Sequence, residues 1–140
     1  MRNLRIAVIG AGRLGGFHAQ KLAAMPEVDL RAVVDPEPAA RNRLAETVGC
    51  KPAADHRSVV DEIDAAVVAA PTCYHHAIGR ELLERGIHLL MEKPLCPAAV
   101  QAGDLVELAQ AKGAILQVGH VERFNPALKA AAPYIRDPKY

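Results

Sequence analysis

The stretch from Leu4 to Gly15 constrains the fold most, because an apolar run leads directly into a Gly-x-Gly-x-x-Gly turn. In a dinucleotide-binding turn, the first glycine (here Gly10) allows a tight bend and the second (Gly12) lets the backbone approach a diphosphate. The third, Gly15, lets the following helix pack closely on the strand, and the amino end of that helix faces the phosphates. The stretch therefore predicts a strand, a nucleotide-binding turn and a helix in succession.

A glycine turn alone is a weak signal, and an acidic residue after the next apolar run strengthens it. Asp35 follows Gly15 by about 20 residues, where the acid that binds the adenosine ribose is expected. Its carboxylate would accept hydrogen bonds from the ribose hydroxyls and repel a 2′-phosphate, which favours NAD over NADP. Arg41 is near enough in the sequence to soften that preference. A second role for Asp35, as a helix N-cap, is compatible with the first and stays open.

Size and composition are those of one folded domain. The chain has 140 residues, of which 51% are hydrophobic. Its 17 basic and 16 acidic residues give a net charge of +1, and only 4% are aromatic, so nucleic acid is a poor candidate partner. The first apolar run is too short to span a bilayer, and three widely spaced cysteines predict neither disulfides nor a metal site. We therefore expect a cytoplasmic protein that binds neither membrane nor metal.

Apolar runs alternate with helical patterns along the chain, which is typical of a parallel sheet. Strands are expected over residues 4–9, 30–34, 65–70, 87–91 and 114–118. Three helices are expected to end at Gly49, Gly86 and Gly113, where a left-handed cap favours glycine. The first helix is expected to bury one arc, formed by Leu14, Phe17, Leu22 and Met25. We predict an α/β fold: a Rossmann doubly wound parallel sheet in a single three-layer domain, with the substrate domain absent.

The same pattern predicts how the chain is divided. Residues 1–122 are expected to form a dinucleotide-binding Rossmann domain. Residues 123–140 are expected to form a C-terminal helix, over 125–135, and the truncated start of a connection to a missing substrate domain. Apolar surface exposed around 121–135 would promote self-association, so we expect a homo-oligomer, as a dimer or a weaker assembly.

Polar residues follow the later strands, at the edge where parallel sheets bind ligands. Pro71-Thr72, with His75, follows the run 65–70, and Glu92-Lys93-Pro94 follows the run 87–91. A lysine there would direct a cation into the cleft, where it could hold a substrate hydroxyl and assist its proton transfer. Taken alone, the Glu92-Lys93 pair is more often a solvated ion pair.

The other histidines have simpler interpretations. His18 and His88 are expected to be packed and hydrogen-bonded, and His56 and His76 to lie at the surface. His120, which follows the last strand, is only a candidate site residue.

Taken together, these segments resemble the N-terminal half of the glucose-fructose oxidoreductase, inositol dehydrogenase and rhizopine catabolism (Gfo/Idh/MocA) oxidoreductase family. The resemblance runs essentially end to end, and the Glu-Lys-Pro motif at this distance from the glycine turn is its most specific part. Its markers are the glycine turn 10–15, Pro71-Thr72 with His75, the run 86–95, and Gly119 with Arg123-Phe124. The segment 119–126 looks most like that of UDP-N-acetylglucosamine 3-dehydrogenases.

The resemblance implies a role for each matching residue. Lys93 would be the catalytic lysine, Glu92 and the Pro71-Thr72 backbone would border the nicotinamide and its ribose, and His75 would support that wall. The Lys93-Pro94 bond would be cis. With the glycine turn and Asp35, the expected cofactor-binding residues are Gly10, Gly12, Arg13, Leu14, Gly15, Asp35, Pro71, Thr72, His75, Glu92, Lys93 and Arg123.

The leading expectation is an NAD-dependent oxidoreductase that transfers hydride between nicotinamide and a sugar or nucleotide-sugar hydroxyl carbon. Because the resemblance places most substrate contacts in a second domain, this chain alone is expected to be inactive. The alternative is a non-catalytic module that binds NAD or another nucleotide, as a sensor or as the partner of a separate chain. An amino-acid semialdehyde dehydrogenase is disfavoured by Glu92-Lys93-Pro94 and by the lack of a convincing nucleophilic cysteine.

Overall fold

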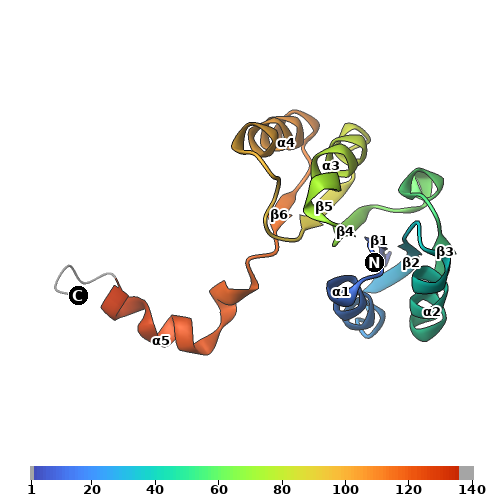
Figure 1. The fold of residues 1–140 in the computed structure, drawn as a ribbon, viewed down its shortest axis with the longest axis horizontal. Coiled ribbons are helices and arrows are strands. Elements are labelled where there is room, and N and C mark those ends of the chain that lie inside the picture. The colour runs from blue at the N-terminus through green and yellow to red at the C-terminus, as the bar shows by residue number, and fades with distance from the viewer. Residues whose placement is uncertain (1, 136–140) are drawn as a thin grey trace.

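The computed structural model describes residues 2–135, which form one parallel six-stranded sheet with helices on both faces (Figure 1). The strand order is β3-β2-β1-β4-β5-β6. The first half contains β1 (Leu4–Ile9), α1 (Arg13–Ala23), β2 (Val28–Val34), α2 (Pro38–Val48) and β3 (Lys51–Ala53). The second half contains β4 (Ala65–Val68), α3 (His75–Glu84), β5 (His88–Met91), α4 (Ala99–Lys112) and β6 (Leu116–Val118). This arrangement confirms the predicted Rossmann fold.

Short 3₁₀ turns and one more helix complete the chain. Between β3 and β4 the chain passes through the turns η1 (His56–Ser58) and η2 (Val60–Glu62). The turn η3 (Thr72–Tyr74) leads into α3, and η4 (Val121–Phe124) leads from β6 towards α5 (Pro126–Ile135). In Figure 1, α5 extends away from the sheet.

Two hydrophobic clusters lie on opposite faces of the sheet. Ile6 and Val8 of β1 pack with α1 and α2, whereas the alternate residues Ala7 and Ile9 pack in the cluster that includes Leu82 of α3. Such burial on both faces explains why the strands are almost continuously apolar. The strand order reverses between β1 and β4, and sheets of this kind bind ligands at the carboxyl edge beside such a reversal.

The helix ends agree with the sequence prediction, but the packing of α1 does not. Gly49, Gly86 and Gly113 all adopt positive φ angles after their helices, as expected. The arc of large residues predicted to bury α1 was wrong in part: Leu22 packs against the core, but Leu14, Phe17 and Met25 are 43–50% exposed. The buried residues of α1 are Gly15 and Ala19. Small residues occupy the buried face of α1 because this helix lies very close to β1 and the glycine turn that follows it.

The strand β3 was not predicted from the sequence. It has three residues, one of them Pro52, and it pairs only with β2 at the sheet edge. Such a short edge strand gives no apolar alternation to detect.

The segment from η4 to α5 is exposed, as expected, with Val121 at 60% and Phe124 at 68%. The predicted division into residues 1–122 and 123–140, and the predicted self-association, remain predictions; residues 136–140 lie outside the described part. Within the described residues, no helix is long and apolar enough to cross a bilayer.

Candidate functional site

Two of the three glycines in the turn lie against backbone atoms, and the third faces open space. A Cβ atom added to Gly10, whose φ is +102°, would lie 2.6 Å from the carbonyl oxygen of Ala69. At Gly15 it would lie 1.8 Å from the carbonyl oxygen of Gly10. At Gly12 it would meet no atom within 4 Å, and Gly12 caps α1 without a side-chain hydrogen bond to the helix. The turn therefore leaves the amino end of α1 open to an anion.

Asp35 and the glycine turn form one hydrogen-bonded unit. The Asp35 Oδ2 atom accepts a 2.7 Å hydrogen bond from the amide of Ala11, and Oδ1 accepts one of 2.9 Å from the amide of Glu37. The alternative role of Asp35 as a helix N-cap is wrong for α2, because Glu37 is the N-cap and accepts a bond from the amide of Ala39. The carboxylate thus stands beside the turn, where a ribose next to a bound diphosphate would come within reach.

Two arginines flank this unit. The Arg41 guanidinium donates hydrogen bonds to the carbonyl oxygens of Asp35 (3.2 Å) and Pro36 (2.9 Å), so it is as close to Asp35 as its sequence position suggested. Arg13 is exposed and stands 5.7 Å from the centre of the Phe17 ring. Leu14, beside it, is also exposed.

A hollow of about 440 Å³ opens next to Asp35 at the carboxyl edge of the sheet. One side is apolar, with Pro71, Tyr74 and Ile78. The opposite side carries His56 and Arg57 from η1. Its full lining is Ile9, Gly10, Val34, Asp35, Pro36, Ala54, Asp55, His56, Arg57, Ala70, Pro71, Tyr74, Ala77, Ile78 and Glu81.

The polar side of this hollow was missed by sequence reasoning. His56, expected at the surface, is 9% exposed, and its Nε2 atom lies 2.9 Å from Glu81. Arg57 donates two hydrogen bonds to Glu81, which lowers the pKa of that carboxyl group, and His56 acts in the same direction. No motif marks η1, and only the fold brings it to Asp35.

His75 joins two loops of the site. It is 1% exposed, its Nε2 atom lies 2.8 Å from the carbonyl oxygen of Ala70, and its Nδ1 atom lies 3.1 Å from those of Pro94 and Leu95. The loop after β4, which carries Pro71 and Thr72, is thereby tied to the loop after β5.

In the Glu-Lys-Pro motif, the acidic residue Glu92 is buried and the basic residue Lys93 is exposed. Glu92 is 6% exposed, with Oε1 2.7 Å from His18 Nε2, and Oε2 accepts a 3.3 Å bond from the amide of Lys93. The Lys93-Pro94 bond is cis, as expected. The Lys93 side chain is exposed, and its ammonium group forms no ion pair with any residue in 2–135. The motif is therefore not the simple Glu-Lys ion pair.

The remaining predicted residues lie apart from this cluster. Arg123 is in the exposed turn η4, and its side chain forms no hydrogen bond with the other site residues in the described structure. His120 is also exposed. His76 pairs with Asp104 at 2.7 Å, and His88 accepts a hydrogen bond from the amide of Ile115. No group of His, Cys, Asp and Glu within the described residues has the arrangement of a metal site.

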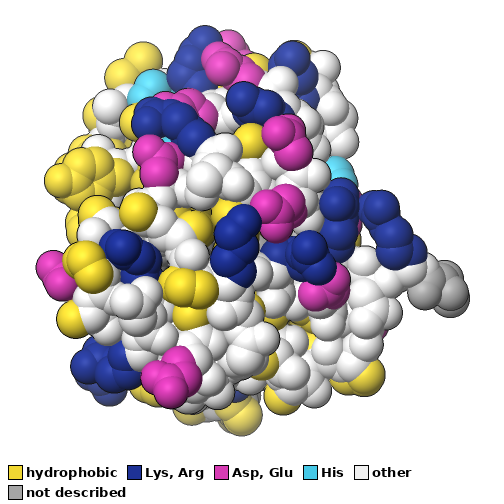
Figure 2. Space-filling view, turned by 90° about the vertical axis from the view of Figure 1, so that its right-hand side faces the viewer, with side chains coloured by type: hydrophobic (Ala, Val, Ile, Leu, Met, Phe, Trp, Pro, Cys, Tyr) yellow, Lys and Arg dark blue, Asp and Glu magenta, His cyan; other side chains and the backbone are white. Residues whose placement is uncertain are grey.

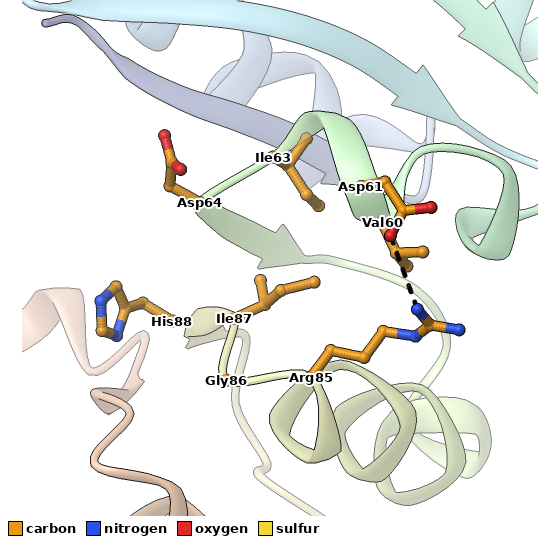
Figure 3. Close-up of a pocket in the computed structure, with 8 residues that line it drawn as sticks. All are labelled: Val60, Asp61, Ile63, Asp64, Arg85, Gly86, Ile87 and His88. Atoms are coloured by element: carbon orange, nitrogen blue, oxygen red, sulfur yellow. Dashed lines mark ion pairs between the residues drawn. The ribbon is translucent and has the colours of Figure 1, made fainter.

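Another hollow, of about 520 Å³, lies at the opposite edge of the sheet, beside the amino ends of β4 and β5 (Figure 3). Arg85 points towards Asp61 across it, with a separation of 3.6 Å, and Asp61 is 93% exposed. It contains neither the glycine turn nor the lysine motif, so size alone does not make it the functional site. On the face that carries α2 and β3, basic and acidic side chains are intermingled (Figure 2).

Comparison with known proteins agrees with this geometry. A family model described as "Oxidoreductase family, NAD-binding Rossmann fold" matches residues 4–120. The chain belongs to this family. The predicted Gfo/Idh/MocA resemblance is confirmed, and so is the cofactor class that it implied.

Individual members of the Gfo/Idh/MocA family are similar over most of the chain. A UDP-N-acetylglucosamine 3-dehydrogenase of Acidithiobacillus ferrooxidans is 33% identical, and the match covers 92% of this chain and 41% of that protein. An inositol 2-dehydrogenase of an Arthrobacter species is 35% identical, over 96% of this chain and 41% of that protein. The crystal structure of GenD2 from gentamicin A biosynthesis, in complex with NAD, superposes with a TM-score of 0.92 and 31% identity, over 99% of this chain and 40% of that chain. The chain thus spans about two fifths of these relatives' length.

Proposed function

We propose that this chain binds NAD and acts as the cofactor-binding part of an oxidoreductase. The observation that carries the proposal is the hydrogen bond between Asp35 and the amide of Ala11, because it places a carboxylate directly beside the open glycine turn. The open space at Gly12 and the uncapped end of α1 suit a diphosphate. The remaining acceptor capacity of Asp35 suits ribose hydroxyls.

The hollow next to Asp35 would hold the adenine. Its apolar side, with Pro71, Tyr74 and Ile78, suits a flat ring, and its polar side offers His56. Arg57 is already paired with Asp55 and Glu81, so it is a poor receptor for an additional phosphate. Together with the charge of Asp35, this supports NAD over NADP, although Arg41 stands close by.

Thr72 after β4 and the Glu92-Lys93-Pro94 turn after β5 would form the nicotinamide part of the site, with Pro71 at the border between this part and the adenine hollow. Bound NAD supplies or accepts the hydride. Lys93 would hold the substrate hydroxyl by its unpaired amino group. As the neutral amine it would take up the hydroxyl proton when the carbonyl forms, and as the ammonium it would return that proton when the carbonyl is reduced. His75 would keep the loop of Thr72 and the loop of Pro94 at a fixed separation. Buried Glu92 would set the turn that presents Lys93.

We propose a sugar or nucleotide-sugar alcohol as the substrate, because the similar proteins include an inositol dehydrogenase and a UDP-N-acetylglucosamine dehydrogenase. Since the chain spans only two fifths of those relatives, we expect little or no turnover from these 140 residues alone. Arg123, in the exposed turn η4, would also take part in cofactor binding.

Calorimetric titration of the chain with NADH and with NADPH tests the proposal. We expect NADH to bind at least about tenfold more tightly than NADPH. Equal or tighter binding of NADPH would overturn the role given to Asp35, and failure of both to bind would overturn the proposed function.

A further inference from the structure

A histidine outside the predicted site residues contacts the lysine motif directly. His18 lies on α1, about one helical turn after Gly15, and its Nε2 atom is 2.7 Å from Oε1 of Glu92. The side chains are 20% and 8% exposed. The contact therefore joins the helix that starts at the glycine turn to the residue that precedes Lys93.

The Glu92 carboxylate has little freedom to move. Its second oxygen accepts the amide of Lys93, and a Cβ atom on Gly119 would lie 3.1 Å from that oxygen. Gly119 itself is bonded through its amide to the carbonyl oxygen of Met91. The carboxylate is thus enclosed by α1, by the Lys93 backbone and by the end of β6, and His18 is its only side-chain partner in the described residues.

The pair formed by His76 and Asp104 provides a comparison. His76 and Asp104 are also 2.7 Å apart, but they are 28% and 39% exposed and join α3 to α4 on the outer surface. The His18-Glu92 pair is more buried and connects two segments that would contact different halves of one ligand. A buried carboxylate also loses more than an exposed one when its partner is removed.

We propose that His18 is a positioning residue: by holding the Glu92 carboxylate it keeps the Glu92-Lys93-Pro94 turn in the position that the nicotinamide half of the cofactor site requires. This inference rests on the proposed function. His18 acts through Glu92 and has no role in binding the adenosine diphosphate half. Its effect is therefore selective for ligands that contain the nicotinamide.

The test compares two ligands in the 140-residue chain. NADH contains the nicotinamide, and ADP-ribose contains the same adenosine diphosphate without it. For His18→Leu we expect the Kd for NADH to rise about tenfold or more, which corresponds to the loss of one charge-assisted hydrogen bond, and the Kd for ADP-ribose to stay within about twofold. His18→Gln, which retains an N–H donor, should restore NADH binding to within about threefold of the unaltered chain.

Two further variants serve as control and as an independent probe. His76→Leu makes the same change in the exposed pair and should alter neither Kd. Gly119→Ala crowds the Glu92 carboxylate while leaving His18 intact, and it should weaken NADH binding selectively. It also keeps the inference testable if His18→Leu fails to fold.

The outcomes separate this inference from the proposed function. If His18→Leu weakens both ligands equally or neither of them, or if Gly119→Ala leaves NADH binding unchanged, His18 has no selective positioning role. If the unaltered chain binds neither NADH nor ADP-ribose, the proposed function itself is wrong, and the inference falls with it.

Discussion

The Asp35 carboxylate accepts a 2.7 Å hydrogen bond from the backbone amide of Ala11, so the residue at the end of β2 is joined directly to the turn after β1. The second oxygen of Asp35 is bonded to the amide of Glu37. Two backbone donors therefore fix the orientation of the carboxylate, and a ribose would meet a group that needs no rearrangement. Preorganisation of this kind lowers the entropy lost on binding.

Replacing Asp35 by serine should reverse part of the cofactor preference. The variant removes the charge that repels a 2′-phosphate and leaves Arg41 nearby. We expect NADH binding to weaken about tenfold and NADPH binding to hold or improve, as measured by calorimetry. Asp61→Ser, which changes an exposed carboxylate at the opposite edge of the sheet, is the matched control. An unchanged NADH to NADPH ratio in Asp35→Ser would contradict the argument.

Alanine substitutions at Gly12 and Gly15 should have different effects, one on NADH affinity and the other on the stability of the fold. At Gly12 the added methyl group meets open space, so the thermal midpoint should stay within about 3 °C, while NADH binding weakens about tenfold or more because the methyl group occupies the approach to the turn. At Gly15 the methyl group would collide with the backbone of Gly10, and the free energy of unfolding should fall by about 3 kcal/mol or more. Urea titration and calorimetry on both variants test this; full NADH affinity in Gly12→Ala would count against a diphosphate there.

Lys93→Ala should separate catalysis from cofactor binding. The side chain is exposed and unpaired within residues 2–135, so its removal should leave stability almost unchanged. When the domain is joined to a substrate domain that supports turnover, the rate should fall about 1000-fold or more, because the proton-transfer group is lost, whereas NADH affinity should stay within about threefold. Steady-state kinetics and a binding titration measure the two effects, with the surface variant Lys112→Ala as control. Retained activity would remove the assigned role.

His75→Phe should destabilise the domain. The variant fills a similar volume but removes the buried ring nitrogens that lie within hydrogen-bond distance of the carbonyl oxygens of Ala70, Pro94 and Leu95. The free energy of unfolding should fall by about 3 kcal/mol. The same change at the partly exposed neighbour His76 should cost less than about 1 kcal/mol. Urea unfolding compares the two, and similar losses would mean that His75 does not tie the loops.

Asp64 should make stability depend on acid pH. The Arg5 guanidinium and backbone amide, with help from Arg2, hold the pKa of Asp64 well below its usual range. A depressed folded-state pKa contributes stability above the unfolded value of about 3.9, and this contribution is lost as the pH falls towards the folded value. Asp64→Asn should therefore cost about 1 kcal/mol at pH 7, allowing for solvent screening, and progressively less below pH 4. Urea unfolding at pH 7 and pH 3 measures the difference, which should be absent in Asp61→Asn.

The sequence predicted those features that depend on local backbone geometry. The glycine turn, the acid at Asp35 and the helix ends at glycine each follow from what one residue type permits at one place. The end of α2 at Gly49 was therefore predicted correctly. The cis bond at Lys93-Pro94 followed from the family resemblance instead.

Features that arise from packing at a distance were not predictable in the same way. The hollow beside Asp35 takes His56 and Tyr74 from 3₁₀ turns that carry no periodicity. The face of α1 was misassigned in part because a close helix-to-strand approach selects small residues, so Leu14 and Phe17 are exposed and only Leu22 of the predicted arc packs against the core. The partnership of His18 with Glu92 joins residues far apart in the chain, and no spacing rule indicates it.

The two hydrophobic clusters lie on opposite faces of the sheet, and both include residues of β1 and β4, the strands at which the two halves of the sheet pair. A molecule bound along the carboxyl edge of the sheet would contact both halves of the sheet at once and would hold them together where β1 pairs with β4. Cofactor binding should then slow amide hydrogen exchange most strongly at the paired backbone of β1 and β4. The cofactor would thus stabilise the domain against local opening in addition to its chemical role.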